Sequence, residues 1–101
     1  MIVIIDYGLG NLTSVKNALD VLNIESETTN DIKKIQKADK IILPGVGAFG
    51  YGMENLRKLG LIEVLQKEVI ENKKLFLGIC LGMQLICKKS YEEGEFEGLG
   101  W

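Results

Sequence analysis

The sequence predicts an α/β fold with a mainly parallel sheet, and three observations support this prediction. Short apolar runs alternate with stretches of helical periodicity along the chain. The first run, Met1–Ile5, is continuously apolar, as is typical of parallel strands covered on both faces. Glycine-rich turns follow three of the expected strands. Since ligands of such sheets bind beyond the carboxyl ends of the strands, we expect these turns to converge on one site.

The first part of the chain reads as three strands separated by helices. Met1–Ile5 is the first strand, and a helix follows whose apolar face consists of Leu12, Val15, Leu19 and Leu22. Ile24–Thr29 alternates apolar or small residues with charged ones, which indicates a second, edge-like strand. A short helical turn is expected at Asp31–Gln36. Asp39–Leu43 then forms the third strand.

The second part continues this alternation. A long helical region is expected at Met53–Asn72, with an interruption at Gly60. The fourth strand is predicted at Lys74–Ile79, and a helix over Leu81–Lys89 follows it. Ser90–Trp101 is acidic and glycine-rich and carries no clear periodicity. The sequence contains no internal repeat and no linker, so we treat residues 1–101 as one domain or part of one.

Composition excludes several classes of protein. With 47% hydrophobic and 26% charged residues, the 101-residue chain resembles a globular domain and differs from a disordered segment. Twelve basic and fourteen acidic residues leave no basic stripe, so we expect no nucleic-acid partner. No apolar run has the length of a membrane span. Asp6 follows the apolar start at once, which argues against a secretory signal, and we expect a cytoplasmic location.

The two cysteines are expected to be free thiols. Cys80 and Cys87 are seven residues apart on one predicted helix, a rise of roughly 10 Å, which is too far for a disulfide. Two cysteines without any histidine make a zinc site improbable, and we expect neither a metal nor a cofactor. We interpret Cys87 as a helix-packing residue.

Cys80 is the candidate nucleophile. It lies in Gly78-Ile79-Cys80-Leu81-Gly82, between a strand and a helix, where flanking glycines let the backbone turn sharply and expose the thiol. Unpaired N–H groups at the start of the helix are expected to favour the thiolate. The alternative is that the glycines only permit tight packing and Cys80 is a small buried apolar residue.

The other two turns differ in what they indicate. Gly8-x-Gly10 follows a strand, but Thr13 replaces the third glycine of a dinucleotide fingerprint, so a plain turn with Asn11 capping the helix is favoured. The third strand ends without an aspartate, which argues against a phospho-acceptor domain. Pro44–Gly47 can expose consecutive N–H groups, and facing Cys80 it would hold an oxyanion. Otherwise it is a rigid turn.

These turns together resemble the triad-type, class I glutamine amidotransferases, most closely the glutaminase subunits of imidazole glycerol phosphate synthases. The matching motifs are Asp6-Tyr7-Gly8-x-Gly10-Asn11-Leu12, Leu43-Pro44-Gly45-Val46-Gly47-Ala48-Phe49 and Gly78-Ile79-Cys80-Leu81-Gly82-Met83-Gln84-Leu85. The resemblance implies a three-layer, Rossmann-like (flavodoxin-like) domain. It extends over the whole chain, and residues 1–101 correspond to the N-terminal half of that domain, through the nucleophile turn.

The resemblance also implies roles for residues. Cys80 would attack the side-chain amide of glutamine, form a glutamyl thioester and release ammonia. Gly47 and the backbone amide of Leu81 would form the oxyanion site, and the substrate-binding positions would be Gly45, Val46, Gln84 and Glu92. Asp6, Tyr7 and Asn11 match scaffold or subunit-contact positions. The alternative for Glu92 is a carboxylate of an exposed acidic segment, and the alternative for Gln84 is an ordinary residue of a helix surface.

The chain departs from the family because it contains no histidine. The family uses a Cys-His-Glu triad whose histidine and glutamate belong to the half that would follow Trp101. Positioned acid–base help is worth about 10² to 10⁴ in rate, so we expect this chain alone to be inactive. A half-sheet also exposes an unpaired edge, for which we expect self-association or a partner.

Two classes of function follow. The first is a glutaminase subunit that supplies ammonia to a (β/α)₈-barrel cyclase as a heterodimer, in histidine biosynthesis or in the related amidination of surface polysaccharides. The second is a non-catalytic half-domain or a cysteine redox module that acts through a partner. A glutamine-like electrophile that labels Cys80 in preference to Cys87 would favour the first class.

Overall fold

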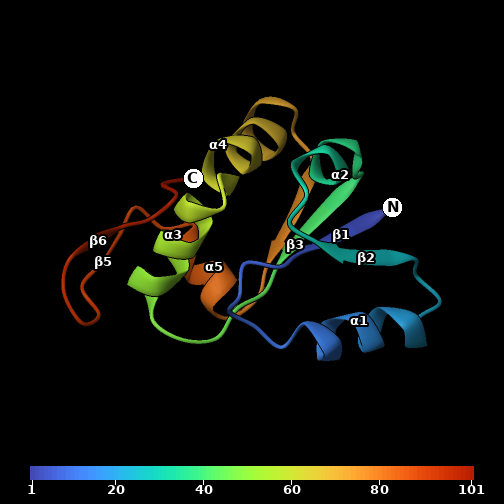
Figure 1. Ribbon diagram of the computed structural model, residues 1–101, viewed down its shortest axis with the longest axis horizontal. Coiled ribbons are helices and arrows are strands. Elements are labelled where there is room, and N and C mark those ends of the chain that lie inside the picture. The colour runs from blue at the N-terminus through green and yellow to red at the C-terminus, as the bar shows by residue number, and fades with distance from the viewer.

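A four-stranded sheet with helices on both faces forms the body of the computed structural model, which describes residues 1–101 (Figure 1). The strand order is β2-β1-β3-β4, and every neighbouring pair is parallel. The strands are β1 (Ile2–Ile5), β2 (Ser26–Thr29), β3 (Lys40–Leu43) and β4 (Leu75–Gly78). The predicted α/β fold with a mainly parallel sheet is therefore confirmed, including the edge position of the second strand.

The helices are divided unevenly between the two faces (Figure 1). Helix α1 (Leu12–Val21) lies alone on one face. The other face carries α2 (Ile32–Lys37), α3 (Phe49–Lys58), α4 (Leu61–Gln66), the π-helical segment η1 (Lys67–Glu71) and α5 (Leu81–Leu85). Hereafter we call these the thin face and the thick face. None of these helices combines the length and the hydrophobicity that a membrane span requires.

The hydrophobic core lies on the thick face. Strand residues of β1 and β3 point into it alternately, and the helices opposite supply fully buried leucines such as Leu56, Leu61 and Leu65. The cluster contains fifteen buried residues. On the thin face, by contrast, α1 has no buried residue, and Leu22, expected on its apolar face, is 65% exposed just after the helix ends. Leu12, Val15 and Leu19 are only half-buried.

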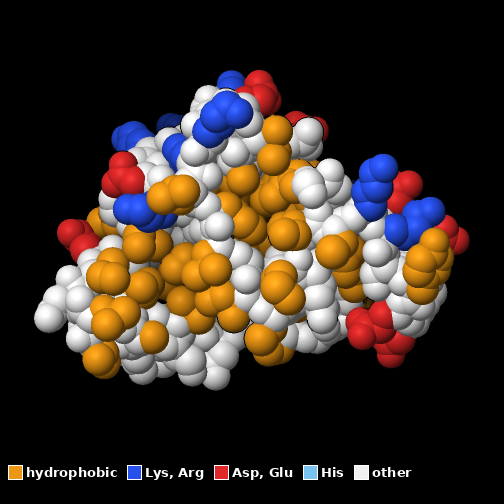
Figure 2. Space-filling model, turned by 180° about the vertical axis from the view of Figure 1, so that it is seen from behind, with side chains coloured by type: hydrophobic (Ala, Val, Ile, Leu, Met, Phe, Trp, Pro, Cys, Tyr) orange, Lys and Arg blue, Asp and Glu red, His pale blue; other side chains and the backbone are white.

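Part of the thin face is uncovered. Leu75 and Leu77 of the edge strand β4 are 67% and 54% exposed. They border a shallow hollow of about 230 Å³ whose other lining residues are almost all hydrophobic: Ile2, Leu19, Lys40, Ile41, Ile42 and Phe76. Figure 2 shows hydrophobic side chains gathered in the middle of the molecule's back, with charged side chains mostly around the rim. Strand β4 thus has both an open edge and exposed apolar side chains.

The long helical region differs from its prediction at both ends. It begins at Phe49 rather than Met53, because Glu92, 43 residues away in sequence, accepts a hydrogen bond from the N–H of Phe49 and caps the helix. The interruption at Gly60 is confirmed: this residue has a φ of 70°, in the left-handed region that glycine tolerates. The region ends in a π-helical segment at Glu71.

The helix predicted over Leu81–Lys89 is four residues too long. It ends at Leu85, because backbone N–H groups of residues 98–101 donate to the carbonyls of residues 85–88. Ser90–Trp101, expected to be irregular, contains a small hairpin of β5 (Lys89–Ser90) and β6 (Phe96–Glu97). The interpretation of Cys87 as a helix-packing residue is wrong, since it lies beyond α5 and is exposed.

A buried ion pair lies at the amino end of β4. Lys74 Nζ lies 2.8 Å from Glu68 Oε1, and these side chains are only 15% and 5% exposed. Lys74 also donates to the carbonyls of Ile35 and Gln36 at the end of α2. The hydrogen bond from Lys74 holds the pKa of Glu68 below its usual value, against the opposing effect of burial. The pair joins η1, α2 and the start of β4.

Candidate functional site

The first two glycine-rich turns are joined at the carboxyl edge of the sheet. The hydroxyl of Tyr7, which follows β1, donates to the carbonyl of Pro44, which follows β3, at 2.6 Å. Asn55 Nδ2 donates to the carbonyl of Tyr7 at 3.0 Å. Gly10 packs on Gly45, and an added Cβ would lie in van der Waals contact with the Gly45 backbone, at 3.4 Å. Burial raises the pKa of Tyr7, which therefore stays protonated and keeps donating.

The third turn is fastened to the second. The N–H of Ile79 donates to the carbonyl of Leu43 at 3.0 Å, and the N–H of Leu81 donates to the carbonyl of Gly45 at 3.1 Å. A Cβ on Gly45 would collide with the Tyr7 hydroxyl, so only glycine fits there. The expectation that the three turns converge is confirmed. They meet beyond the carboxyl ends of β1 and β3, which are neighbours in the sheet and after which the chain leaves toward opposite faces. Ligands of such sheets usually bind at this place.

Cys80 occupies a strained turn between β4 and α5. Its φ of 52° and ψ of −116° lie in a region that residues with a side chain rarely adopt, at a cost of about 1 to 3 kcal/mol. The flanking glycines make the turn possible. A Cβ on Gly78 would lie 2.8 Å from the backbone of Met83, and one on Gly82 would collide with the carbonyl of Leu43. Cys80 is exposed, so the alternative of a buried apolar residue is wrong.

The first amides of α5 are already occupied, contrary to the expectation of unpaired N–H groups beside the thiol. Leu81 donates to Gly45, Gly82 donates to Ile79, and the N–H groups of Met83 and Gln84 both donate to the carbonyl of Cys80. The helix is only five residues long. In this conformation, Leu81 can serve an oxyanion only by giving up its bond to Gly45, and its predicted role stays a prediction.

Free backbone donors lie instead in the loop before α3. The N–H groups of Val46, Gly47 and Ala48 donate to no protein group. Val46 and Gly47 are exposed, and Gly47 has a φ of 117° with open space around its Cα. Of these donors, Ala48 was not predicted from the sequence. The N–H of Ala48 is recognised as a free donor only once it is known that α3 begins one residue later, at Phe49.

Gln84 and Glu92, predicted to hold the substrate's amino-acid end, border the same hollow. It measures about 260 Å³, and its other lining residues are Phe49, Cys87, Lys89 and Ser90. Glu92 also borders a second hollow of about 240 Å³ together with Gly47, Ala48 and Glu93. Cys80 lines neither of them. Glu92 therefore lies between the loop of free donors and Gln84, although it is 43 residues from Phe49 in sequence.

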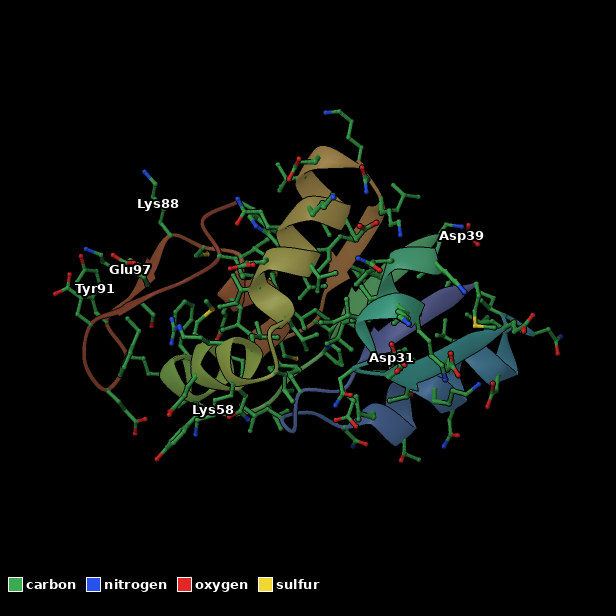
Figure 3. All side chains as sticks on the ribbon, turned by 45° about the horizontal axis from the view of Figure 1, so that its top comes forward. Asp31, Asp39, Lys58, Lys88, Tyr91 and Glu97 are labelled. Carbon is green, nitrogen blue, oxygen red and sulfur yellow. The ribbon has the colours of Figure 1, made fainter.

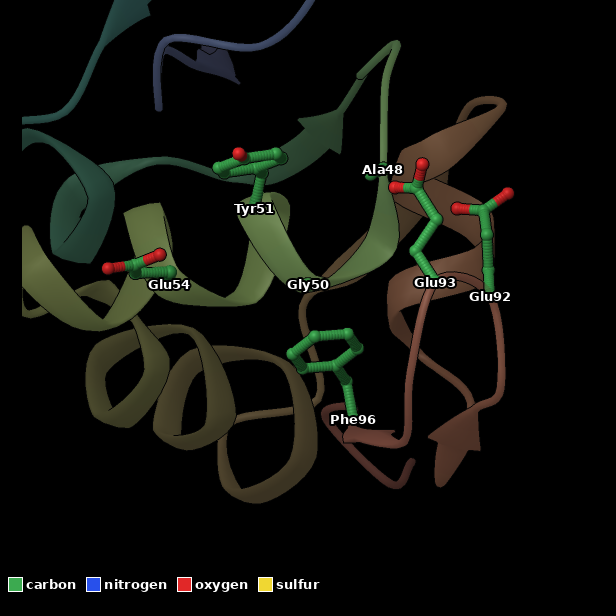
Figure 4. A pocket seen from close by; sticks show the side chains of 7 residues that line it. All are labelled: Ala48, Gly50, Tyr51, Glu54, Glu92, Glu93 and Phe96. Atoms are coloured by element: carbon green, nitrogen blue, oxygen red, sulfur yellow. The ribbon is translucent and has the colours of Figure 1, made fainter.

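Two residues that the sequence did not single out, Gly50 and Phe96, lie against each other close to Glu92. Phe96 of β6 packs its ring on Gly50 of α3, beside a hollow of about 300 Å³ that Glu92 and Glu93 also line (Figure 4). A Cβ on Gly50 would lie 2.8 to 3.0 Å from three ring atoms of Phe96. No group of three or more cysteine, aspartate or glutamate side chains is placed to hold a metal ion.

Comparison with known proteins gives a consistent result. The family model described as glutamine amidotransferase class-I matches residues 3–93. The subunit HisH 2 of imidazole glycerol phosphate synthase from Methanococcus maripaludis is 52% identical over 101 residues, which are all of this chain and 50% of that protein. The HisH subunit from Aquifex aeolicus is also 52% identical, over 97% of this chain and 47% of its own length.

A solved structure supports the same assignment. A crystal structure of a glutamine amidotransferase matches 97% of this chain with a TM-score of 0.77 and 25% sequence identity, and the match covers 51% of that protein. The chain thus spans about half the length of the relatives that it matches.

Proposed function

This chain belongs to the class-I glutamine amidotransferase family, and from this we propose that Cys80 is the nucleophile of a glutaminase site. The thiolate sulfur bonds to the side-chain amide carbon of glutamine, the C–N bond breaks, and the nitrogen takes a proton and leaves as ammonia. Water then hydrolyses the glutamyl thioester to glutamate and regenerates the thiol. The observation that carries this proposal is the exposed, strained Cys80 between two glycines that cannot accept a Cβ.

The loop of free donors supports the next element of the proposal, a site for the oxyanion. Attack on the amide places negative charge on its oxygen, and Gly47 is the proposed donor in the Val46–Ala48 loop. Leu81 would be a second donor once its N–H exchanges the carbonyl of Gly45 for the oxyanion. Removal of one such donor typically raises the barrier by about 2.7 to 4 kcal/mol.

Gln84 and Glu92 would bind the amino-acid end of glutamine, with Gly45 and Val46 alongside. Their shared hollow supports this assignment, because it offers an amide and a carboxylate to the substrate's carboxylate and ammonium groups. Only one carboxylate oxygen of Glu92 is engaged within the protein, by the N–H of Phe49. The other is left for a substrate ammonium.

The proton transfers need a base that these residues do not provide. The chain has no histidine, and the other side chains do not ordinarily titrate near neutrality. We therefore propose that residues 1–101 bind glutamine but do not turn it over appreciably. A glutaminase assay should read near background, and hydrolysis that disappears in Cys80→Ala would contradict this.

The names of the relatives suggest the partner. They are subunits of imidazole glycerol phosphate synthase, so we propose that the complete domain supplies ammonia to a (β/α)₈-barrel cyclase subunit in the cytoplasm. The acceptor is either the intermediate of imidazole glycerol phosphate synthesis or a sugar of a surface polysaccharide. The proposed release of ammonia at Cys80 is the same for either acceptor.

Covalent labelling tests the proposal. The chloromethyl ketone analogue of glutamine should alkylate Cys80 with saturation kinetics, as the thiolate displaces chloride, and glutamine should protect it. Cys87 is also an exposed free thiol and borders the hollow of Gln84 and Glu92, so the matched variant is Cys87→Ser, which should keep the saturable, glutamine-protected labelling. Peptide mass mapping should find the label on Cys80, and Cys80→Ala should remove it. Equal labelling of both cysteines, without protection by glutamine, would overturn the proposal.

A further inference from the structure

The Glu92 carboxylate has a well-defined place although it belongs to a surface loop. Its Oε1 accepts a hydrogen bond of 3.2 Å from the N–H of Phe49, the first residue of α3. Ala48, at the N-cap position, offers no side-chain cap, so Glu92 supplies the acceptor that the helix lacks. The helix N-terminus also favours a carboxylate electrostatically. The other oxygen, Oε2, makes no hydrogen bond or ion pair within the chain.

This place depends on how the β5–β6 hairpin is attached to α3. The ring of Phe96 contacts Gly50, one residue beyond Phe49, and also lies close to Gly94 in the hairpin turn. An added Cβ on Gly94 would be 3.2 Å from that ring. The ring thus lies between α3, whose N-terminus Glu92 caps, and the turn to which Glu92 belongs (Figure 4).

Two polar contacts lie within the hairpin itself. The N–H of Glu92 donates to Ser90 Oγ at 3.1 Å, and Lys89 pairs with Glu95 at 2.8 Å. Glu93 and Gly94 both have positive φ, which shapes the turn but does not attach it to α3. Besides the hydrogen bond of Glu92, the Phe96 ring is therefore a side-chain contact that joins the hairpin to α3.

We propose that Phe96 is a positioning residue for the binding of glutamine. Its packing on Gly50 holds the Glu92 carboxylate at the N-terminus of α3, with Oε1 engaged and Oε2 directed to the substrate's ammonium group. The role rests on the proposed glutaminase site, but it concerns the affinity for substrate and leaves the reactivity of Cys80 unchanged. Phe96 itself touches no reacting atom.

The test separates binding from reactivity with the chloromethyl ketone of glutamine. Phe96→Ala should raise the half-saturating concentration about tenfold, the change expected when one charge-assisted hydrogen bond is lost, and leave the maximal labelling rate unchanged. Iodoacetamide needs no glutamine pocket, so it should alkylate Cys80 of the Phe96→Ala variant at the same rate as Cys80 of the unmodified chain. Phe96→Leu, which keeps an apolar contact on Gly50, should recover most of the affinity.

The matched control is Tyr91→Ala in the same hairpin. Tyr91 is 75% exposed and lies on the outer side of the hairpin, away from the helices (Figure 3). This variant should bind the analogue as the unmodified chain does. Gly50→Ala approaches the contact from the helix side, because its Cβ displaces the ring, and it should reproduce the effect of Phe96→Ala.

Each result decides between the alternatives. Saturable labelling of the unmodified chain with unchanged affinity in Phe96→Ala would overturn the positioning role and leave the glutaminase site standing. Labelling of the unmodified chain that does not saturate and is not prevented by glutamine would overturn both. If neither Phe96→Ala nor Gly50→Ala retains its far-ultraviolet circular dichroism, the contact serves the fold alone and the positioning role is also overturned.

Discussion

The two faces of the sheet are built very differently. The thick face is covered by four helices and a π-helical segment and holds a cluster of fifteen buried residues. The thin face has a single helix without a buried residue, and it leaves Leu75 and Leu77 of β4 exposed. Both faces belong to the same four strands, so the contrast comes from the helices that the connecting segments place on each face.

This difference shows on which face the candidate site depends. Tyr7, Phe49 and Leu81 belong to the core cluster of the thick face, and each also fixes part of the site. The Tyr7 hydroxyl donates to the carbonyl of Pro44, and the N–H of Phe49 donates to the Glu92 carboxylate. Leu81 directly follows Cys80 and begins α5. The site is therefore an extension of the thick-face core. Substitutions on the thin face should leave it largely undisturbed.

The largest effect is expected from the core of the thick face. Leu56 is fully buried, and Leu56→Ala should lower the free energy of unfolding by about 2 to 5 kcal/mol, through lost burial and the cavity left behind. The matched variant is Leu22→Ala, just after the thin-face helix, where the side chain is 65% exposed and the change should stay within about 0.5 kcal/mol. Urea denaturation measures both, and similar losses would contradict the contrast between the faces.

The buried ion pair should come next. Glu68→Gln leaves the Lys74 ammonium without its carboxylate, and we expect a loss of about 3 kcal/mol. The thin-face pair of Lys16 and Asp20 is exposed, so Asp20→Asn should cost no more than about 1 kcal/mol. Thermal unfolding of the two variants at neutral pH gives the comparison, and equal shifts would count against a special role for burial.

The same pair predicts a dependence on acid. The pKa of Glu68 is lowered from 4.5 in the folded state, so the unfolded chain takes up its proton first as the pH falls. The stabilisation is complete above 4.5 and is lost as the pH falls through the folded pKa. Stability measured from pH 7 to pH 3 should fall less steeply in Glu68→Gln. Parallel curves for the two proteins would contradict this.

The bond between the first two turns should contribute less than the ion pair. Tyr7→Phe removes the donor to Pro44 and leaves a buried carbonyl without a partner, at a cost of about 1 to 3 kcal/mol. Because burial raises the pKa of Tyr7 above its usual 10.0, the unfolded chain loses that proton first, and stability should decline as the pH rises beyond 10.0. Chemical denaturation of Tyr7→Phe should lack this part of the alkaline decline.

The smallest effect on stability, but a clear effect on assembly, is expected at β4. The open edge and exposed leucines predict self-association, and Leu77→Lys should reduce it while changing the free energy of unfolding by no more than about 0.5 kcal/mol. Sedimentation velocity over a range of concentrations measures the effect. A concentration-independent monomer of the unmodified chain would show that the uncovered face does not drive association.

The parts of the fold that the sequence predicted well are those that local pattern decides. The strand ending at Ile5 is apolar throughout, and Gly60 is suited to a left-handed break, so both could be recognised without any contact information. The convergence of the turns followed from parallel topology alone. Asn11 was expected to cap α1, and its side chain does accept a hydrogen bond from the N–H of Ser14.

The parts that were missed depend on contacts distant in sequence. Gly50 and Gly52 weaken the helical pattern at the start of α3, which is instead fixed by Glu92. The end of α5 is set by the last residues of the chain, whose N–H groups occupy its carbonyls. At the site, the position of Cys80 was recognised from its motif. The occupied amide of Leu81 and the contact between Phe96 and Gly50 require knowledge of the packing.

The last residue provides a spectroscopic probe that needs no label. Trp101 is the only tryptophan, its ring meets that of Phe76 edge-on at 5.0 Å, and its backbone N–H donates to the carbonyl of Ile86 just beyond α5. The indole Nε1 is buried without a partner. Emission at tryptophan wavelengths therefore reports one event, the docking of the final segment beside β4. A shift of that emission to longer wavelength, at denaturant concentrations where the helical signal persists, would reveal this segment detaching before the core unfolds.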